Sequence, residues 1–176
     1  FTLESPRSLA MNRIYMDHSA TTPVAPEVLQ AMLPYFSQKF GNASSLHSYG
    51  LEAKEALEES REKVAHLLKA DSQEIVFTSG GTESDNLALL GTARKNANLG
   101  RHIITSIIEH PAILETCRSL EREGFSVTRL PVTRDGLIDL SDLEKAIRPD
   151  TILISIMHAN NEIGTMSDIT RTGRLC

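Results

Sequence analysis

The chain has 176 residues, of which 40% are hydrophobic and 23% are charged, and its formal net charge is −5. These values are typical of a globular protein with a core of ordinary size. The net negative charge, without any Lys/Arg-rich block, argues against nucleic-acid and membrane-surface binding. No apolar run approaches a membrane span, and Cys117 and Cys176 form neither a disulfide framework nor a metal-ligand pair. We therefore expect a cytoplasmic protein without a bound metal.

In the N-terminal part of the chain we predict a short strand, a helix and a long loop. Residues 1–12 are expected to be an extension outside the native structure, and residues 13–16 are predicted to form a short strand. Pro26 opens a helix that Pro34 kinks or ends. Residues 40–50 have loop composition, and a loop of this length is either functional or a solvated connector.

Strand-like and helical segments alternate along the rest of the chain. Helices are expected over residues 51–69, 83–97, 111–124 and 142–147 and from Ser167 onwards, and strands over 74–79, 102–106, 126–130 and 151–157. Such alternation is typical of a parallel sheet covered on both faces, so we predict an α/β protein with a doubly wound, mainly parallel sheet. Cys117 lies on the apolar face of its helix and is expected to be a core residue.

Polar clusters follow three of these strands. They are Gly80-Gly81-Thr82, Glu109-His110-Pro111 and the segment 158–164, which contains Asn160-Asn161. Because ligands of doubly wound sheets bind beyond the carboxyl ends of the strands, the clusters predict a site on one rim of the sheet.

Each cluster also has a structural explanation. The two glycines could let the backbone approach an anion at a helix N-terminus, or could form a tight connection with Ser79 or Thr82 as a helix cap. His110 could stack on a flat heterocycle and move protons, or could be a surface or capping histidine. The Asn160-Asn161 pair could hold a ligand oxygen or could cap a turn.

Five motifs at nearly constant spacing resemble those of the cysteine desulfurases, in the class V aminotransferase family of pyridoxal-phosphate enzymes. They occupy residues 15–23, 40–47, 74–86, 107–112 and 157–165. The resemblance implies the fold type I of pyridoxal-phosphate-dependent transferases, here incomplete. It implies that residues 13–50 contribute to the small domain and the active-site loops, and that residues 51–176 form part of the large cofactor-binding domain.

The resemblance also implies roles for single residues. Gly81 and Thr82 would hold the phosphate of pyridoxal 5′-phosphate. His110 would stack on the pyridine ring and assist proton transfer, and Asn161 would contact the phenolic oxygen of the ring. The protein would position the cofactor, which acts as an electron sink.

The family converts L-cysteine to L-alanine and passes the sulfur to a cysteine of the enzyme as a persulfide. This sulfur supplies iron–sulfur clusters and thionucleosides, so the resemblance implies a homodimer that meets sulfur-acceptor or scaffold proteins. The Schiff-base lysine, the aspartate at the pyridine nitrogen, the substrate-binding arginine and the persulfide cysteine of the family have no match in residues 1–176. The chain is therefore expected to be an N-terminal portion that is inactive alone.

Three alternatives remain open at this stage. The whole protein could be a selenocysteine lyase, or another class V aminotransferase. The chain could also be a non-catalytic half that requires a complementary chain.

Overall fold

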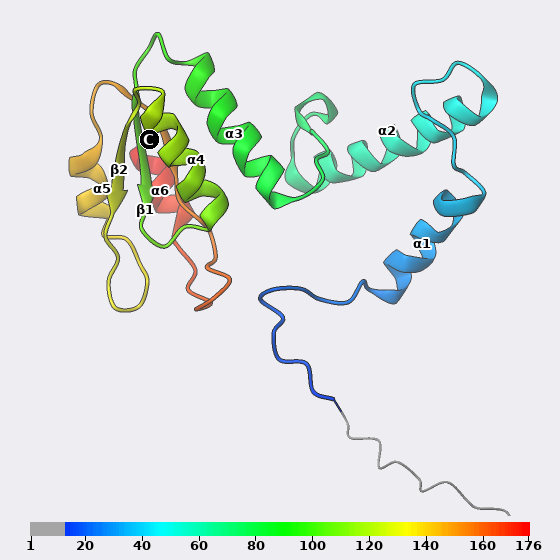
Figure 1. Ribbon diagram of the computed structural model, residues 1–176, viewed down its shortest axis with the longest axis horizontal. Helices are drawn as coiled ribbons and strands as arrows, with labels where there is room; N and C mark the ends of the chain where they lie inside the picture. Colours follow the sequence, from blue (N-terminus) through cyan, green and yellow to red (C-terminus); the bar gives the residue numbers. More distant parts are fainter. Residues whose placement is uncertain (1–12) are drawn as a thin grey trace, which may run out of the picture. The chain divides into compact units, whose positions relative to one another are not determined.

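The structure is a computed structural model that describes residues 13–176, and it divides the chain into two compact units (Figure 1). The first unit ends at Ser72, and the second spans Gln73–Cys176. The extension expected over residues 1–12 lies outside the described residues. Within the described range, no helix combines the length and the apolar character needed to cross a membrane.

The described part of the first unit contains two long helices, α1 (Pro26–Ser37) and α2 (Ser48–Leu68), with a loop between them. The side chain of His47 caps α2 by accepting a hydrogen bond from the N–H group of Gly50 at 3.4 Å. Gly41 lies so close to the start of α2 that a Cβ atom there would be 2.0 Å from the carbonyl oxygen of Tyr49. Only glycine fits this approach, so the predicted loop is packed against the first turn of α2.

One prediction for the first unit is wrong, because residues 13–16 form no strand. Of the two effects predicted for Pro34, the end of the helix does not occur, since α1 continues past it to Ser37, and the kink stays a prediction. The Pro34 ring removes one backbone donor and crowds the carbonyl group one turn earlier, but the carbonyl oxygen of Pro34 accepts from the N–H groups of Gln38 and Lys39 at 2.9 and 2.8 Å. Hydrogen bonding on its C-terminal side therefore carries the helix beyond the proline.

The second unit is built on a three-stranded parallel sheet with the order β2-β1-β3. Its strands are β1 (His102–Ser106), β2 (Ser126–Leu130) and β3 (Thr151–Ser155). Helix α4 (Pro111–Arg122) connects β1 to β2, and α5 (Leu140–Ala146) leads from β2 past β1 to β3. Because the chain visits both neighbours of the central strand in turn, the sheet is doubly wound, which confirms the predicted fold class.

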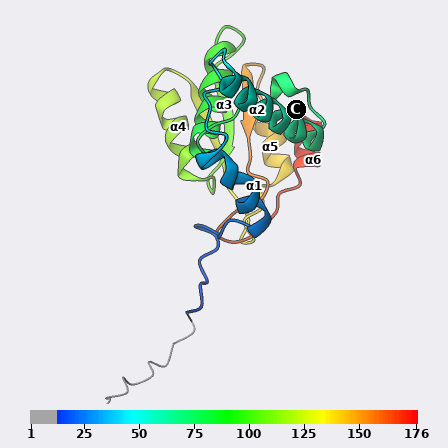
Figure 2. The ribbon, with the colours of Figure 1, turned by 90° about the vertical axis from the view of Figure 1, so that its right-hand side faces the viewer.

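Helices cover both faces of this sheet (Figure 2). α3 (Gly81–Lys95) and α4 pack on one face, and α5 and α6 (Ile169–Leu175) pack on the other. Ile103 and Ile104 are adjacent in β1 and enter opposite cores, as alternation along a strand requires. Cys117 is fully buried in the core of the α3–α4 face, which confirms the prediction for it. Burial raises the pKa of its thiol.

The strand predicted over residues 74–79 is not formed. Ser72–Glu74 is a short 3-10 helix, η1, and the segment that follows is not a strand, with Val76 and Phe77 64% and 46% exposed. β-Branched and aromatic residues suit a pleated surface, but a strand also needs a neighbouring ladder. The described sheet consists of β2, β1 and β3, and the segment forms no ladder with either of its edge strands. The assignment of residues 51–176 to a large domain stays a prediction.

His102 is fully buried in the central strand and links all three strands. Its Nδ1 atom lies 2.7 Å from the hydroxyl of Thr151 in β3, and its Nε2 atom lies 2.8 Å from the hydroxyl of Thr128 in β2. A neutral imidazole, with one donor and one acceptor, satisfies both hydroxyls. Burial lowers the pKa of His102, and the nearby Arg148 lowers it further.

We expect the second unit to lose stability as the pH falls below about 6.5, because the unfolded chain then takes up a proton that the folded His102 resists. One such group contributes at most about 1.4 kcal/mol per pH unit to the free energy of unfolding. Urea unfolding at several pH values should show this slope, and His102→Gln should remove it. His66→Gln, at an exposed histidine, should leave it in place. An unchanged slope in the His102 variant would contradict the assignment.

Candidate active site

Helix α3 begins without a side-chain cap. Its N-cap residue is Gly80, and its first backbone hydrogen bond runs from the N–H group of Ser84 to the carbonyl of Gly80 at 3.1 Å. The N–H groups of residues 81–83 therefore have no intrahelical acceptor. A Cβ atom added at Gly80 or Gly81 would meet no atom within 4 Å. The turn thus presents N–H donors and the positive end of the helix dipole to open space.

Side chains around this turn hold the loop that precedes α3. The Glu83 carboxylate accepts hydrogen bonds from both the N–H group and the hydroxyl of Ser79, each at 2.7 Å. These bonds lower the pKa of Glu83, so its carboxylate is ionised at neutral pH. The hydroxyl of Thr78 lies 2.7 Å from that of Ser84. Ser79 is thus held by Glu83, and neither Ser79 nor Thr82 caps α3, so the capping alternative is wrong.

Thr82 and His110 line one open groove of about 420 Å³ between α3 and α4. Two polar side chains brace this groove. The Thr116 hydroxyl on α4 donates to Oδ1 of Asn86 on α3 at 2.8 Å, and Nδ2 of Asn86 donates to the carbonyl oxygen of Thr82 at 2.8 Å. The sequence interpretation missed this bridge. Thr116 could have indicated it, because a hydroxyl on the apolar face of a helix, here beside Cys117, needs a polar partner on a neighbouring element.

His110 is the N-cap residue of α4. Its Nδ1 atom accepts a hydrogen bond from the N–H group of Ala112 at 3.1 Å. The bond fixes the orientation of the ring and, in the neutral form, places the ring proton on Nε2. The capping interpretation of His110 is therefore correct. Because His110 is exposed, its cap role leaves Nε2 accessible to a ligand in the groove.

The ends of β1 and β3 meet at the point where the winding of the sheet reverses. The chain leaves β1 toward α4 on one face and leaves β3 toward α6 on the other. Adjacent strands whose connections diverge in this way open a crevice that binds ligands in doubly wound sheets. His110 follows β1 and Asn161 follows β3, so both predicted residues lie on loops that border this crevice.

The two asparagines after β3 have different environments. Asn160 is buried, and its Oδ1 atom accepts from the N–H groups of Glu162 and Ile163 at 2.9 and 3.1 Å. Asn161 is exposed, and its Nδ2 atom lies 3.3 Å from the carboxylate of Glu162. The turn-capping alternative therefore holds for Asn160, whereas the Asn161 side chain faces solvent.

Glu109 is a buried carboxyl group directly before His110. It is 6% exposed, and its Oε1 atom accepts from the Ser106 hydroxyl at 2.7 Å and from the N–H group of Met157 at 2.9 Å. Burial raises the pKa of Glu109, and the two hydrogen bonds oppose this shift. The sequence placed Glu109 in a polar cluster but gave no indication of its contact with the β3 loop.

The lysines of the second unit lie away from this rim. Lys95 is at the C-terminal end of α3, and Lys145 pairs with Asp142 on α5 at 3.2 Å. Residues 73–176 therefore place donors and an imidazole at the groove, but no lysine amine beside them. Over the described part of the chain, no cluster of three or more His, Cys, Asp or Glu side chains is arranged to hold a metal ion.

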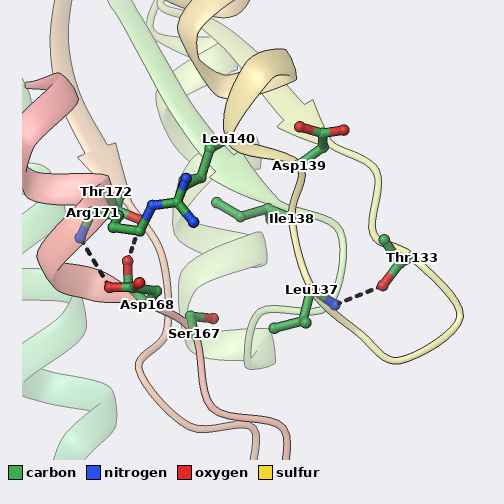
Figure 3. A pocket seen from close by; sticks show the side chains of 9 residues that line it. All are labelled: Thr133, Leu137, Ile138, Asp139, Leu140, Ser167, Asp168, Arg171 and Thr172. Carbon is green, nitrogen blue, oxygen red and sulfur yellow. Dashed lines mark hydrogen bonds between the residues drawn. The ribbon is translucent and has the colours of Figure 1, made fainter.

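A second hollow of about 370 Å³ lies between the β2–α5 connection and the start of α6 (Figure 3). Two of its carboxylates cap short helices: Asp139 accepts from the N–H group of Ser141, and Asp168 accepts from that of Arg171. Figure 3 shows the Arg171 side chain extending across the hollow toward Leu140. None of the predicted site residues lines this hollow.

The family model for aminotransferase class-V matches residues 14–176. The chain therefore belongs to the class V aminotransferase family. It is 54% identical over 162 residues to the cysteine desulfurase IscS of Dictyoglomus turgidum, a match that covers 92% of this chain and 41% of the relative. It is 50% identical over 165 residues to the putative cysteine desulfurase IscS 1 of Bacillus subtilis, a match that covers 94% of this chain and 44% of that relative.

Solved structures give the same result. A NifS-like protein superposes with a TM-score of 0.89 at 44% identity, covering 93% of this chain and 45% of that one. SspA in complex with cysteine superposes with a TM-score of 0.86 at 46% identity, covering 92% of this chain and 46% of that one. The chain thus spans less than half the length of these relatives.

Proposed function

We propose that the chain forms the phosphate-binding and ring-facing part of the pyridoxal 5′-phosphate site of a cysteine desulfurase. One observation carries the proposal: Thr82, in the first turn of the uncapped helix α3, and the capping His110 of α4 line the same groove. An anion-binding turn beside an imidazole suits a ligand that combines a phosphate with a flat ring.

The donor groups of the turn fit a phosphate monoester. The N–H groups of Gly81 and Thr82 lack intrahelical acceptors, and the hydroxyl of Thr82 is a further donor in the groove. The open space around Gly80 and Gly81 lets phosphate oxygens approach the backbone. Because the positive end of the α3 dipole adds to these donors, Gly81 and Thr82 would hold the phosphate.

His110 and Asn161 would contact the ring from the two loops at the crevice. The α4 cap holds the His110 ring through Nδ1, so Nε2 can hold or release a proton. The Asn161 carboxamide can donate to a phenolic oxygen while remaining uncharged. When bound, the cofactor supplies an electron sink for bond cleavage at the substrate.

The proposed reaction converts L-cysteine to L-alanine and transfers sulfur to a cysteine of the enzyme for iron–sulfur cluster and thionucleoside assembly. It would be carried out in the cytoplasm by a homodimer that meets sulfur-acceptor or scaffold proteins. The names of the relatives and the cysteine complex of SspA support the choice of substrate. Cys117 is too buried for the sulfur-accepting role, and Cys176 is exposed but lies outside the motifs that carry the resemblance. Neither cysteine is assigned that role.

A hybrid enzyme tests this proposal. Residues 14–176 would replace the matching segment of the Dictyoglomus turgidum relative, which would contribute the remaining length of the enzyme. We expect the hybrid to release L-alanine from L-cysteine, with the unaltered relative as the control. A folded hybrid that binds the cofactor but acts only on L-selenocysteine would indicate a selenocysteine lyase. One that acts on neither amino acid would contradict the proposed function.

A further inference from the structure

Two buried side chains cross between the loops at the sheet crevice, in opposite directions. The carboxylate of Glu109, on the loop after β1, accepts from the N–H group of Met157 after β3 at 2.9 Å. The Asn160 carboxamide, on the loop after β3, donates to the carbonyl oxygen of Ile108 after β1 at 3.1 Å. Each loop therefore contributes one side chain and one backbone group to the same pair of bonds.

Each crossing side chain immediately precedes an exposed residue of the candidate site. Glu109 and Asn160 are 6% and 8% exposed, whereas their neighbours His110 and Asn161 are exposed. The bonds leave the site residues uninvolved, because His110 bonds to its own helix and Asn161 to its neighbour Glu162. The buried pair therefore fixes the backbone positions from which both site residues project.

Each crossing side chain is also anchored within its own loop. The Oε1 atom of Glu109 accepts from the Ser106 hydroxyl at 2.7 Å, at the end of β1. The Oδ1 atom of Asn160 accepts from the Glu162 N–H group at 2.9 Å, while the backbone N–H group of Asn160 donates to the Thr165 carbonyl at 2.9 Å. Because each of the two residues bonds both to its own loop and to the facing loop, the distance between the loops is constrained.

We propose that Glu109 and Asn160 form a reciprocal latch that holds the His110 loop and the Asn161 loop at a fixed separation. Both are positioning residues, which act on the cofactor ring only through their neighbours. The part of the inference that concerns catalysis rests on the proposed function, whereas the latch itself is a property of the chain without cofactor.

Amide hydrogen exchange in the cofactor-free 176-residue chain tests the latch directly. Glu109→Ala removes the acceptor for Met157, so the Met157 amide should exchange roughly tenfold faster. Glu109→Gln retains an oxygen at this position and should restore most of the protection. The Ile103 amide, in the central strand, is the internal control. Unchanged exchange at Met157 in the alanine variant, or equally faster exchange at Ile103, would overturn the latch.

A mutant cycle in the hybrid enzyme separates positioning from general stabilisation. Misplacing catalytic groups by about 1 Å costs on the order of 100-fold in rate, so Glu109→Ala should lower turnover by roughly 10- to 100-fold with a smaller effect on KM. In a His110→Asn background, the same change should have a smaller effect, because His110, one of the two site residues that the latch positions, is absent. Equal losses in both backgrounds would contradict the positioning of His110 by Glu109.

Asn160→Asp isolates the other half of the latch. Aspartate keeps the acceptor for the Glu162 and Ile163 amides but has no N–H group for the Ile108 carbonyl. We expect the hybrid to lose turnover while these two amides remain protected, and full turnover would count against the latch. Failure of the proposed function can be distinguished from failure of the latch. An inactive unsubstituted hybrid would contradict the proposed function, whereas the exchange experiment on the cofactor-free chain would still test the latch.

Discussion

Replacing His110 with asparagine in the hybrid enzyme is expected to lower turnover by roughly 100-fold or more, the range in which a positioned general acid or base acts. Asparagine is a favourable N-cap residue and can still accept from the Ala112 N–H group, so α4 should keep its start. The substitution therefore removes the imidazole without removing the cap. Steady-state kinetics with L-cysteine measures the effect.

Two further substitutions make the His110 result specific. His110→Phe keeps an aromatic ring but no ionisable nitrogen, so it should retain cofactor better than His110→Asn and still turn over slowly. His66→Asn changes an exposed histidine on α2, outside the predicted site, and should leave turnover near that of the unsubstituted hybrid. If His110→Asn kept full activity, the ring would have no role in the reaction.

Replacing Thr82 with valine is expected to weaken binding of pyridoxal 5′-phosphate by roughly 10- to 100-fold. Hydrogen bonds to charged groups contribute about 1.5–3 kcal/mol, and valine lacks the hydroxyl donor. Valine has nearly the shape of threonine and a similar helix propensity, so α3 should be preserved. Fluorescence titration of the cofactor-free hybrid measures the dissociation constant.

Thr82→Ser is the matched control, because serine keeps the hydroxyl and loses only a methyl group. It should bind the cofactor with nearly the original affinity. Equal affinities for the valine, serine and unsubstituted forms would remove Thr82 from the phosphate site, whereas equal weakening in both variants would point to packing rather than to the hydroxyl.

The parallel sheet was predictable because its elements carry strong local signals. The strands at 102–106 and 126–130 are found as expected, and Pro111 opens α4 at the predicted residue. Gly124, with a φ angle of +87°, follows the end of this helix. In these segments, backbone preference and burial favour the same structure.

The strand predicted over residues 74–79 is not formed, because the prediction rested only on the local residue types. Its β-branched and aromatic residues favour a strand, but strand formation depends on a partner that the sequence does not specify. The expected helix start nearby was closer to correct, because the glycines and Thr82 determine where α3 can begin. The anion-binding turn could thus be predicted even though the strand before it could not.

The positions of the exposed residues of the candidate site could be predicted from the sequence, whereas the contacts of its buried residues could not. His110 and Asn161 follow strands, and the rule for doubly wound sheets places such residues at the ligand crevice. The contacts of Glu109 with Met157 and of Asn86 with Thr116 join residues far apart in the sequence, 48 and 30 positions respectively. Such pairs follow from tertiary packing, which spacing within one segment does not reveal.

The most direct test of the central claim is a titration of the isotope-labelled chain with pyridoxal 5′-phosphate and, separately, with pyridoxal, which lacks the phosphate. The amide signals of Gly81, Thr82 and Glu83 should shift with the phosphorylated compound and remain in place with pyridoxal. The same shifts with both compounds, or shifts confined to residues away from the start of α3, would contradict a phosphate site at this turn.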